Sequence, residues 1–326
     1  MDPRLTRVDD YPIPTLEEYL AAQPTLAEDA GGQAAPYAHP IDRGLIRALS
    51  RTALQHAVKH FVQLAIDARF TPLWQHSVPV AARSFPELNR LRAEAAAALG
   101  IAVPELYVGA LAGYGAIFTV GTDERHFIFV DSTWLSLAEP DEILFVLGHE
   151  CGHIQNRHVT YHTLAVLLLE GGATALRQHP ALRPWSELLR LLIGPALAAW
   201  ARRSEITGDR AGLLTLRLAR PEASEEWVLA TAQRSLVRLL LGFARDAQVE
   251  IDAYLDDMRR RSPDSLAARY SLLTAAHPLP PHRLEALRLF HDSELYYECA
   301  RRPRPERPLL ATRELNERVD DLIAVL

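Results

Sequence analysis

The chain has 326 residues, of which 48% are hydrophobic and 23% charged, enough apolar material for one large domain or two small ones. Its formal net charge of -6 argues against a general nucleic-acid-binding protein, because such proteins present a basic face. Two cysteines, Cys151 and Cys299, give no disulfide framework, and the start of the sequence shows no signal-peptide pattern. These features predict a cytoplasmic protein.

Composition divides the chain into three parts. Residues 1–43, rich in Pro, Ala and Asp, predict an irregular N-terminal arm; residues 44–302 form the main domain; residues 303–326 form a proline-arginine linker and an amphipathic C-terminal helix. The first half of the domain has both helical and strand-like spacing. The expected elements are helices Leu45–Phe70 and Pro86–Leu99, the strand Leu106–Val108, and a hairpin of Ala116–Val120 and His126–Val130.

The chain after the hairpin is almost entirely helical, so the fold class is predicted to be α+β and mostly α-helical. Helices are expected at Pro140–His153, Leu164–Ala175, Trp185–Arg203, Glu205–Ala219, Ser224–Arg245, Asp252–Arg261, Pro263 to near His277, Arg283–Ala300 and Thr312–Val325. No run reaches the 18 or more uncharged apolar residues typical of a membrane span. A peripheral membrane contact stays open as an alternative.

The expected helix at Pro140–His153 contains the motif H-E-x-x-H, which begins at His149 and ends at His153. Residues four apart lie on one face of a helix, so both imidazoles can bind one metal ion. Glu150, between them, can reach a water molecule on that metal. This is the minimum set for zinc-assisted amide hydrolysis. The alternative is a helix with two ordinary histidines and a surface glutamate.

Catalytic zinc usually takes a third protein ligand. The metzincin position for it holds Val159, which excludes that class. His158 lies five residues after His153, a rotation of about 140° on a continuous helix, and is expected to be a packing or surface residue. Glu205 and Asp209 are a better pair, since one carboxylate can bind zinc while the other orients a ligand histidine. The alternative for them is a helix start with solvated acids.

A second group of candidates follows later in the chain. His277 precedes Pro278 and two further prolines, which hold it on a rigid loop, and Arg283 begins a helix six residues on. Both can donate to the negative charge that develops on a carbonyl oxygen during hydrolysis. The alternative is a proline-rich helix entry without chemistry.

With these motifs in this order, the chain resembles the M48 family of zinc metallopeptidases, the family of the CAAX-prenyl endopeptidases and the HtpX-type and Oma1-type proteases. The segment Glu142–His153 is similar to the family's helix, Glu205–Asp209 matches its E-x-x-x-D, and His277-Pro278 with Arg283 looks like its HP-x4-R element. The resemblance runs from about Val103 to Leu287.

The resemblance implies a zincin-like (gluzincin) fold with a small sheet beside the active-site helix, and one Zn²⁺ per chain. It implies that His149, His153 and Glu205 hold the zinc, with Glu150 as general base and Asp209 behind the ligands. His277 would face the reacting carbonyl. Either Ala116–Val120 or His126–Val130 would be the sheet edge that pairs with an extended substrate.

The predicted function is therefore a zinc-dependent endopeptidase that cleaves extended or unfolded protein segments, with protein or peptide substrates and no nucleic acid as partner. Many members carry membrane spans where Leu164–Ala201 is charged and broken here, which favours a soluble form. The alternative is a latent or non-cleaving zinc-binding interaction or chaperone-like protein, whose cleft a terminal segment occupies. The sequence carries no signal for the oligomeric state.

Overall fold

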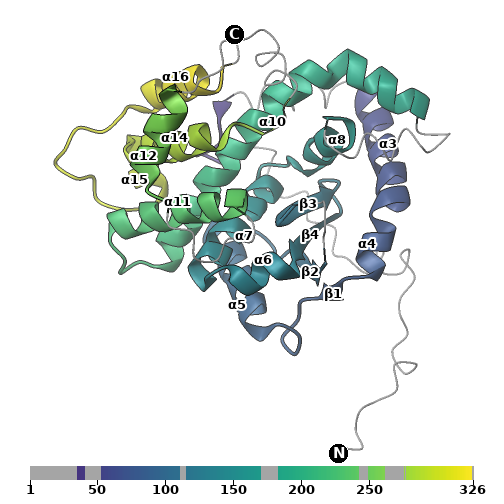
Figure 1. Ribbon diagram of the computed structural model, residues 1–326, viewed down its shortest axis with the longest axis horizontal. Helices are drawn as coiled ribbons and strands as arrows, with labels where there is room; N and C mark the ends of the chain where they lie inside the picture. The colour runs from purple at the N-terminus through teal and green to yellow at the C-terminus, as the bar shows by residue number, and fades with distance from the viewer. Residues whose placement is uncertain are drawn as a thin grey trace, which may run out of the picture. The chain divides into compact units, whose positions relative to one another are not determined.

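The computed structural model describes residues 35–40, 53–110, 115–169, 183–241, 249–260, 275 and 277–324. The chain divides into two compact units, residues 1–32, which lie outside the described residues, and residues 33–326, to which the following refers. The expected mostly helical α+β class is confirmed, since helices surround one small sheet (Figure 1).

The described elements follow the chain in this order: α3 (Ala53–Arg69), α4 (Thr71–Gln75), β1 (Val78–Pro79), α5 (Pro86–Leu99), β2 (Glu105–Gly109), β3 (Ile117–Gly121), β4 (His126–Asp131), α6 (Ser132–Leu137), α7 (Pro140–Gln155), α8 (Val159–Leu169), α10 (Arg183–Ala219), α11 (Glu225–Leu241), α12 (Ile251–Arg260), α14 (Pro280–His291), α15 (Glu294–Cys299) and α16 (Thr312–Ile323).

The sheet has the strand order β1-β2-β4-β3. β4 runs parallel to β2 and antiparallel to β3, with Phe118 opposite Phe129 and Gly121 opposite His126. The predicted hairpin is therefore confirmed. Of the two strands expected as the sheet edge, β3 lies at an edge, while β4 is interior, so His126–Val130 was the wrong alternative.

The two faces of the sheet carry different side chains because neighbouring residues of a strand point to opposite sides. Leu106, Val108, Ile128 and Val130 belong to the same hydrophobic cluster as the buried residues of α5 and α7. On the opposite face, the rings of Tyr107, Phe118 and Phe129 stack at centroid distances of 5.6 and 5.7 Å. The first of these faces packs against α7, which places β3 beside that helix.

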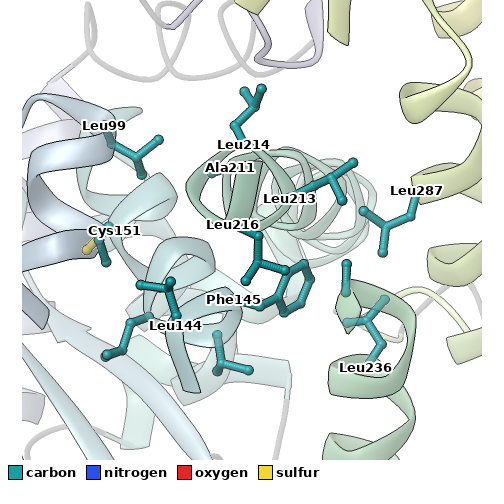
Figure 2. Packing of buried hydrophobic residues seen from close by; sticks show 14 of the residues in the cluster. Leu99, Leu144, Phe145, Cys151, Ala211, Leu213, Leu214, Leu216, Leu236 and Leu287 are labelled. Carbon is teal, nitrogen blue, oxygen red and sulfur yellow. The ribbon is translucent and has the colours of Figure 1, made fainter. Parts of the chain in front are cut away.

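The core lies where α7 packs against α10. Figure 2 shows Leu144 and Phe145 of α7 grouped with Leu213 and Leu216 of α10, with Leu287 of α14 nearby. These side chains are almost fully buried. Burying this much apolar surface stabilises the crossing of the two helices that carry the candidate site.

Three of the expected helices have other bounds in the structure. Trp185–Arg203 and Glu205–Ala219 are one 37-residue helix, α10, because Ser204 does not end a helix there: its hydroxyl donates to the carbonyl of Ala201 at 2.8 Å. The expected helix Arg283–Ala300 begins earlier, at Pro280, and is interrupted after α14. Ser293 caps the N-terminus of α15, where its hydroxyl accepts from the backbone N–H of Tyr296.

The described part of the N-terminal arm, residues 35–40, is bound to the domain. The backbone N–H of Ala35 donates to Asn156, that of His39 donates to Thr207, and the buried Arg210 donates to the carbonyl of Tyr37. At the other end, α16 buries three apolar side chains in the common core: Leu315, Val319 and Ile323. The three-part division stays a prediction.

The remaining helix predictions are confirmed over the described residues. α5 ends at Gly100, whose φ of 68° is the left-handed conformation that glycine adopts without strain. Parts of the expected helices, residues 45–52, 170–175, 242–245, 263–274 and 325, lie outside the described residues. Within the described part of the chain, no helix has both the length and the apolar character needed to cross a bilayer.

Candidate metal centre and active site

The candidate site lies where α7 and α10 cross, and glycines allow the two backbones to approach. A Cβ on Gly152 would lie 2.4 Å from the Cβ of Ala211, and one on Gly208 would lie 2.6 Å from Cε1 of His149. Gly148 and Gly212 are equally crowded, by Thr215 and Phe145. Glycines recur four residues apart on both helices, so each helix offers a flat face to the other. The crossing of α7 and α10 was not predicted, although this spacing of glycines is visible in the sequence.

The crossing brings together three predicted metal ligands, His149, His153 and Glu205, all buried. The Nε2 atoms of the two histidines lie 3.0 Å apart. Oε2 of Glu205 lies 3.6 Å from Nε2 of His149, and Oε1 lies 3.5 Å from Nε2 of His153. Two imidazole nitrogens and a carboxylate therefore converge on one point from two helices.

His149 is oriented by Asp209. Its Nδ1–H donates to Oδ1 of Asp209 at 3.0 Å, which leaves Nε2 directed at the other ligands. Burial lowers the pKa of His149, but this hydrogen bond and the charges of Glu205 and Asp209 outweigh burial, so the pKa is raised. Arg283 in turn donates to both oxygens of Asp209, at 2.8 and 2.6 Å. A chain of charged groups thus fixes the ring.

His153 is oriented by His158. The two Nδ1 atoms lie 3.2 Å apart, and burial lowers the pKa of His153 to about 4 and that of His158 well below its usual value. Both rings are therefore neutral at pH 7, and the Nδ1–H of His153 can donate to the lone pair of His158. His158 is fully buried, as the packing alternative expected, but its contact with His153 was missed.

His158 reaches His153 because the chain turns sharply between α7 and α8. α7 ends at Gln155, and Arg157 has a φ of 57°, a left-handed conformation that redirects the chain into α8. The rotation of about 140° assumed a continuous helix, which does not exist here. After the turn, His158 and His162 lie four residues apart, and both reach the site.

Glu205 is surrounded by donors. Nε2 of His162 lies 3.0 Å from its Oε1, and Arg283 and Nδ1 of His277 lie 3.2 and 3.3 Å from its Oε2. Burial would raise the pKa of Glu205, but the charges of His277 and Arg283 hold it well below its usual range. The buried carboxylate is therefore ionised. His162 was not singled out from the sequence, and its spacing from His158 was the only signal.

Glu150 points toward the sheet. The hydroxyl of Thr119, a buried residue of the edge strand β3, donates to Oε2 of Glu150 at 2.5 Å. The end of β3 is also tied to α8, because the N–H of Gly121 donates to the hydroxyl of Thr163. The strand edge and the glutamate of the motif are thus held together.

His277 and Arg283 occupy different positions. The side chain of His277 is 45% exposed, whereas Arg283 is mostly buried and commits its guanidinium to Asp209 and Glu205. Those carboxylates raise the pKa of Arg283 although burial opposes the charge. Arg283 is therefore a positioning residue, and of the two expected oxyanion donors only His277 faces solvent.

The donor set fits a divalent cation. The Nδ1 atoms of His149 and His153 are committed to other partners, so their two Nε2 atoms, 3.0 Å apart, are the nitrogens left to bind a cation. The carboxylates of Glu150, Glu205 and Asp209 outnumber the guanidinium of Arg283 in this buried cluster. Buried charges of this kind are paired or coordinate metals.

A helix-borne pair of histidines, a glutamate from a second helix and a small sheet beside them define a zincin-like metallopeptidase domain of the gluzincin kind. The chain belongs to peptidase family M48, whose sequence model matches residues 82–290.

Two curated proteins are similar to the chain. "Plastoglobule-localized metallopeptidase 48, chloroplastic" of Arabidopsis thaliana is 29% identical over 212 residues, covering 63% of this chain and 56% of the relative. "Protease HtpX homolog" of Sulfurihydrogenibium sp. (strain YO3AOP1) is 33% identical over 92 residues, 28% of this chain and 30% of the relative. The chain thus matches about half of the first relative's length and less of the second's. No solved structure matches it.

Proposed function

We propose that this chain is a zinc-dependent endopeptidase that hydrolyses peptide bonds in extended or unfolded protein segments. The observation that carries the proposal is the buried group of His149, His153 and Glu205 with Glu150 on the same turn of α7. These three residues would hold the zinc ion. When bound, zinc supplies a Lewis acid, which polarises a carbonyl group and makes water easier to deprotonate.

Glu150 is the proposed general base. It takes a proton from the attacking water, whose oxygen bonds to the carbonyl carbon, and delivers that proton to the amine nitrogen as the C–N bond breaks. Thr119 donates to Oε2 of Glu150 and so leaves Oε1 as the oxygen that exchanges the proton. The carboxylate does not need to reorient between the two transfers, because one oxygen stays anchored.

His277 is the proposed donor to the carbonyl oxygen. It is the most exposed histidine of the site, and its contact with Glu205 places it at the open side of the ligand cluster. Arg283, Asp209 and His158 act through the ligands by fixing their orientation.

The preference for extended segments is supported by β3. Hydrogen bonds to β4 use the residues on either side of Thr119. The N–H and C=O groups of Thr119 itself therefore point outward at the edge of the sheet. No strand pairs with this side of β3 among the described residues. A peptide in extended conformation can add there as a further strand and pass Glu150. Folded proteins rarely present a free extended segment.

The proposal is tested by cleavage of one substrate in two states. The purified chain is incubated with reduced, carboxymethylated ribonuclease and with the native, disulfide-bonded form, and the products are identified by mass spectrometry. Internal cuts in the unfolded form only, abolished by a chelator and restored by zinc, are expected. Release of terminal residues only, or cleavage that survives the chelator, would contradict it.

The alternative of a latent or non-cleaving zinc-binding protein is tested with the same sample. Its proposed terminal segments are residues 1–43 and 303–326, and residues 1–34 lie outside the described part of the chain. Because α16 belongs to the common core, only residues 1–34 are trimmed: a latent enzyme whose cleft they occupy gains activity, whereas a non-cleaving protein binds zinc and stays inactive.

A further inference from the structure

His162, on α8, contacts the candidate metal centre but has no part in the proposed reaction. It is 8% exposed, and its ring lies 4.7 Å from that of His153 between centroids. Its Nε2 lies 3.0 Å from Oε1 of Glu205. An ionised carboxylate can only accept, so Nε2 carries the hydrogen and donates it.

The two oxygens of Glu205 are held by different donors. His162 contacts Oε1, whereas Arg283 and His277 contact Oε2. The donors of Oε2 come from α14 and the loop before it, and the donor of Oε1 comes from α8. A carboxylate fixed at only one oxygen can still swing about its terminal bond, but one fixed at both cannot.

His162 acts on the metal centre through Glu205. Among the described residues, the group whose ligand atoms all lie within 4.8 Å of one another is His149, His153 and Glu205, and His162 is outside it. Its ring also meets that of His277 edge to face, at 6.1 Å and 68°. His162 therefore lies beside His277, and each of the two rings contacts a different oxygen of Glu205.

We propose that His162 is a positioning residue: by donating to Oε1 it holds the Glu205 carboxylate in the orientation that binds the metal, and so raises the affinity for zinc. The inference rests on the proposed zinc site but not on catalysis. Hydrogen-bond partners behind metal ligands commonly change metal affinity by about 10–100-fold. A similar contribution from His162 is expected.

The test compares zinc affinity, measured by competition with a chromophoric chelator, in three full-length proteins. His162→Leu removes the donor and should weaken zinc binding by about 10–100-fold. His162→Gln keeps an N–H₂ donor at similar reach and should stay within about threefold of wild type. Tyr161→Phe removes the hydroxyl of a buried residue of the same helix, whose ring meets that of Trp200, and should leave the zinc affinity unchanged.

Cobalt-substituted protein supplies a second readout, because its visible absorption reports the ligand geometry. The spectrum should change in His162→Leu and be restored in His162→Gln. If the Leu variant does not fold by circular dichroism, His162→Asn, whose amide is too short to reach Oε1, replaces it. Wild-type zinc affinity and spectrum in His162→Leu, or loss of both in a folded His162→Gln, would overturn the inference.

Failure of the proposed function gives a different result. Wild-type protein that binds zinc but cleaves nothing contradicts the endopeptidase and leaves the affinity comparison intact. Wild-type protein that binds no zinc would contradict both the endopeptidase proposal and the role of His162.

Discussion

Gly208 packs its backbone directly against the imidazole of His149. A Cβ at this position would lie 2.6, 2.8 and 2.9 Å from three atoms of the ring, closer than side-chain atoms approach without displacement. The neighbouring turns of α10 carry Glu205 and Asp209, so the same close approach that seats the ring also supplies its partners. The position of His149 thus depends on the absence of a methyl group on another helix.

Gly208→Ala should displace His149 from the ligand cluster. We expect zinc affinity to fall at least tenfold and the free energy of unfolding to decrease by about 1–3 kcal/mol from overpacking. Chelator competition and urea denaturation measure the two effects. Gly194→Ala, on the same helix, is the control, since its Cβ would meet nothing closer than 3.6 Å. Wild-type affinity in Gly208→Ala would contradict the described crossing.

Asp209→Asn should weaken zinc binding by about 10–100-fold, because the amide loses the charge that pairs with Arg283 and orients His149. Zinc affinity by chelator competition is the measurement. Asp320→Asn is the control. It removes the charge of a more exposed carboxylate on α16, which pairs with Arg203 at 2.8 Å, and should leave the zinc affinity unchanged. Equal losses in both variants would point to a general charge effect.

Thr119→Val should lower kcat by about tenfold or more, because Glu150 loses the donor that anchors Oε2. KM and bound zinc should stay near wild type, since the lost hydroxyl donates to Glu150 and the substitution leaves the backbone of Thr119 unchanged. Thr119→Ser restores the hydroxyl and should recover most of kcat. A rise in KM with unchanged kcat would instead assign Thr119 to substrate binding.

The stability of the fold should depend on pH through Asp123. Burial raises the pKa of this carboxyl to about 6, against about 3.9 in an unfolded chain, although Thr160 donates to it. The folded state therefore holds a proton that the unfolded state releases between about pH 4 and 6, and the free energy of unfolding falls as the pH rises through that window.

Asp123→Asn should remove this dependence. Urea denaturation at pH 4.5 and 7 is the measurement, and the wild type should lose more stability between the two values than the variant. Asp321→Asn, an exposed residue of α16, is the control and should follow the wild type. Parallel curves for wild type and Asp123→Asn would contradict the raised pKa.

Local patterns were sufficient to predict the elements with strong local signals. Gly100 ended α5, Pro140 began α7, and alternating residues around Gly121 predicted the hairpin, because each depends on interactions within a few residues. The continuity of α10 through Ser204 was missed because a serine can either begin a helix or bond back to the preceding turn, and the sequence does not distinguish them.

The candidate site was predicted where residues share one helix and missed where a turn brings them together. His149 and His153 follow from helical spacing, and Glu205 and Asp209 follow in the same way. His158 and His162 reach the site only because Arg157 reverses the chain, and the left-handed conformation of an arginine has no sequence signature. Thr119 reaches Glu150 through strand order, which depends on contacts distant in sequence.

The central claim, a zinc site with Glu150 as its base, is tested most directly by measuring bound zinc and casein cleavage in the same preparations of wild type and Glu150→Gln. The expected result is about one zinc per chain in both proteins, with internal cleavage by the wild type only. Zinc in both proteins with equal cleavage would contradict the role of Glu150, and no zinc in the wild type would contradict the metal centre itself.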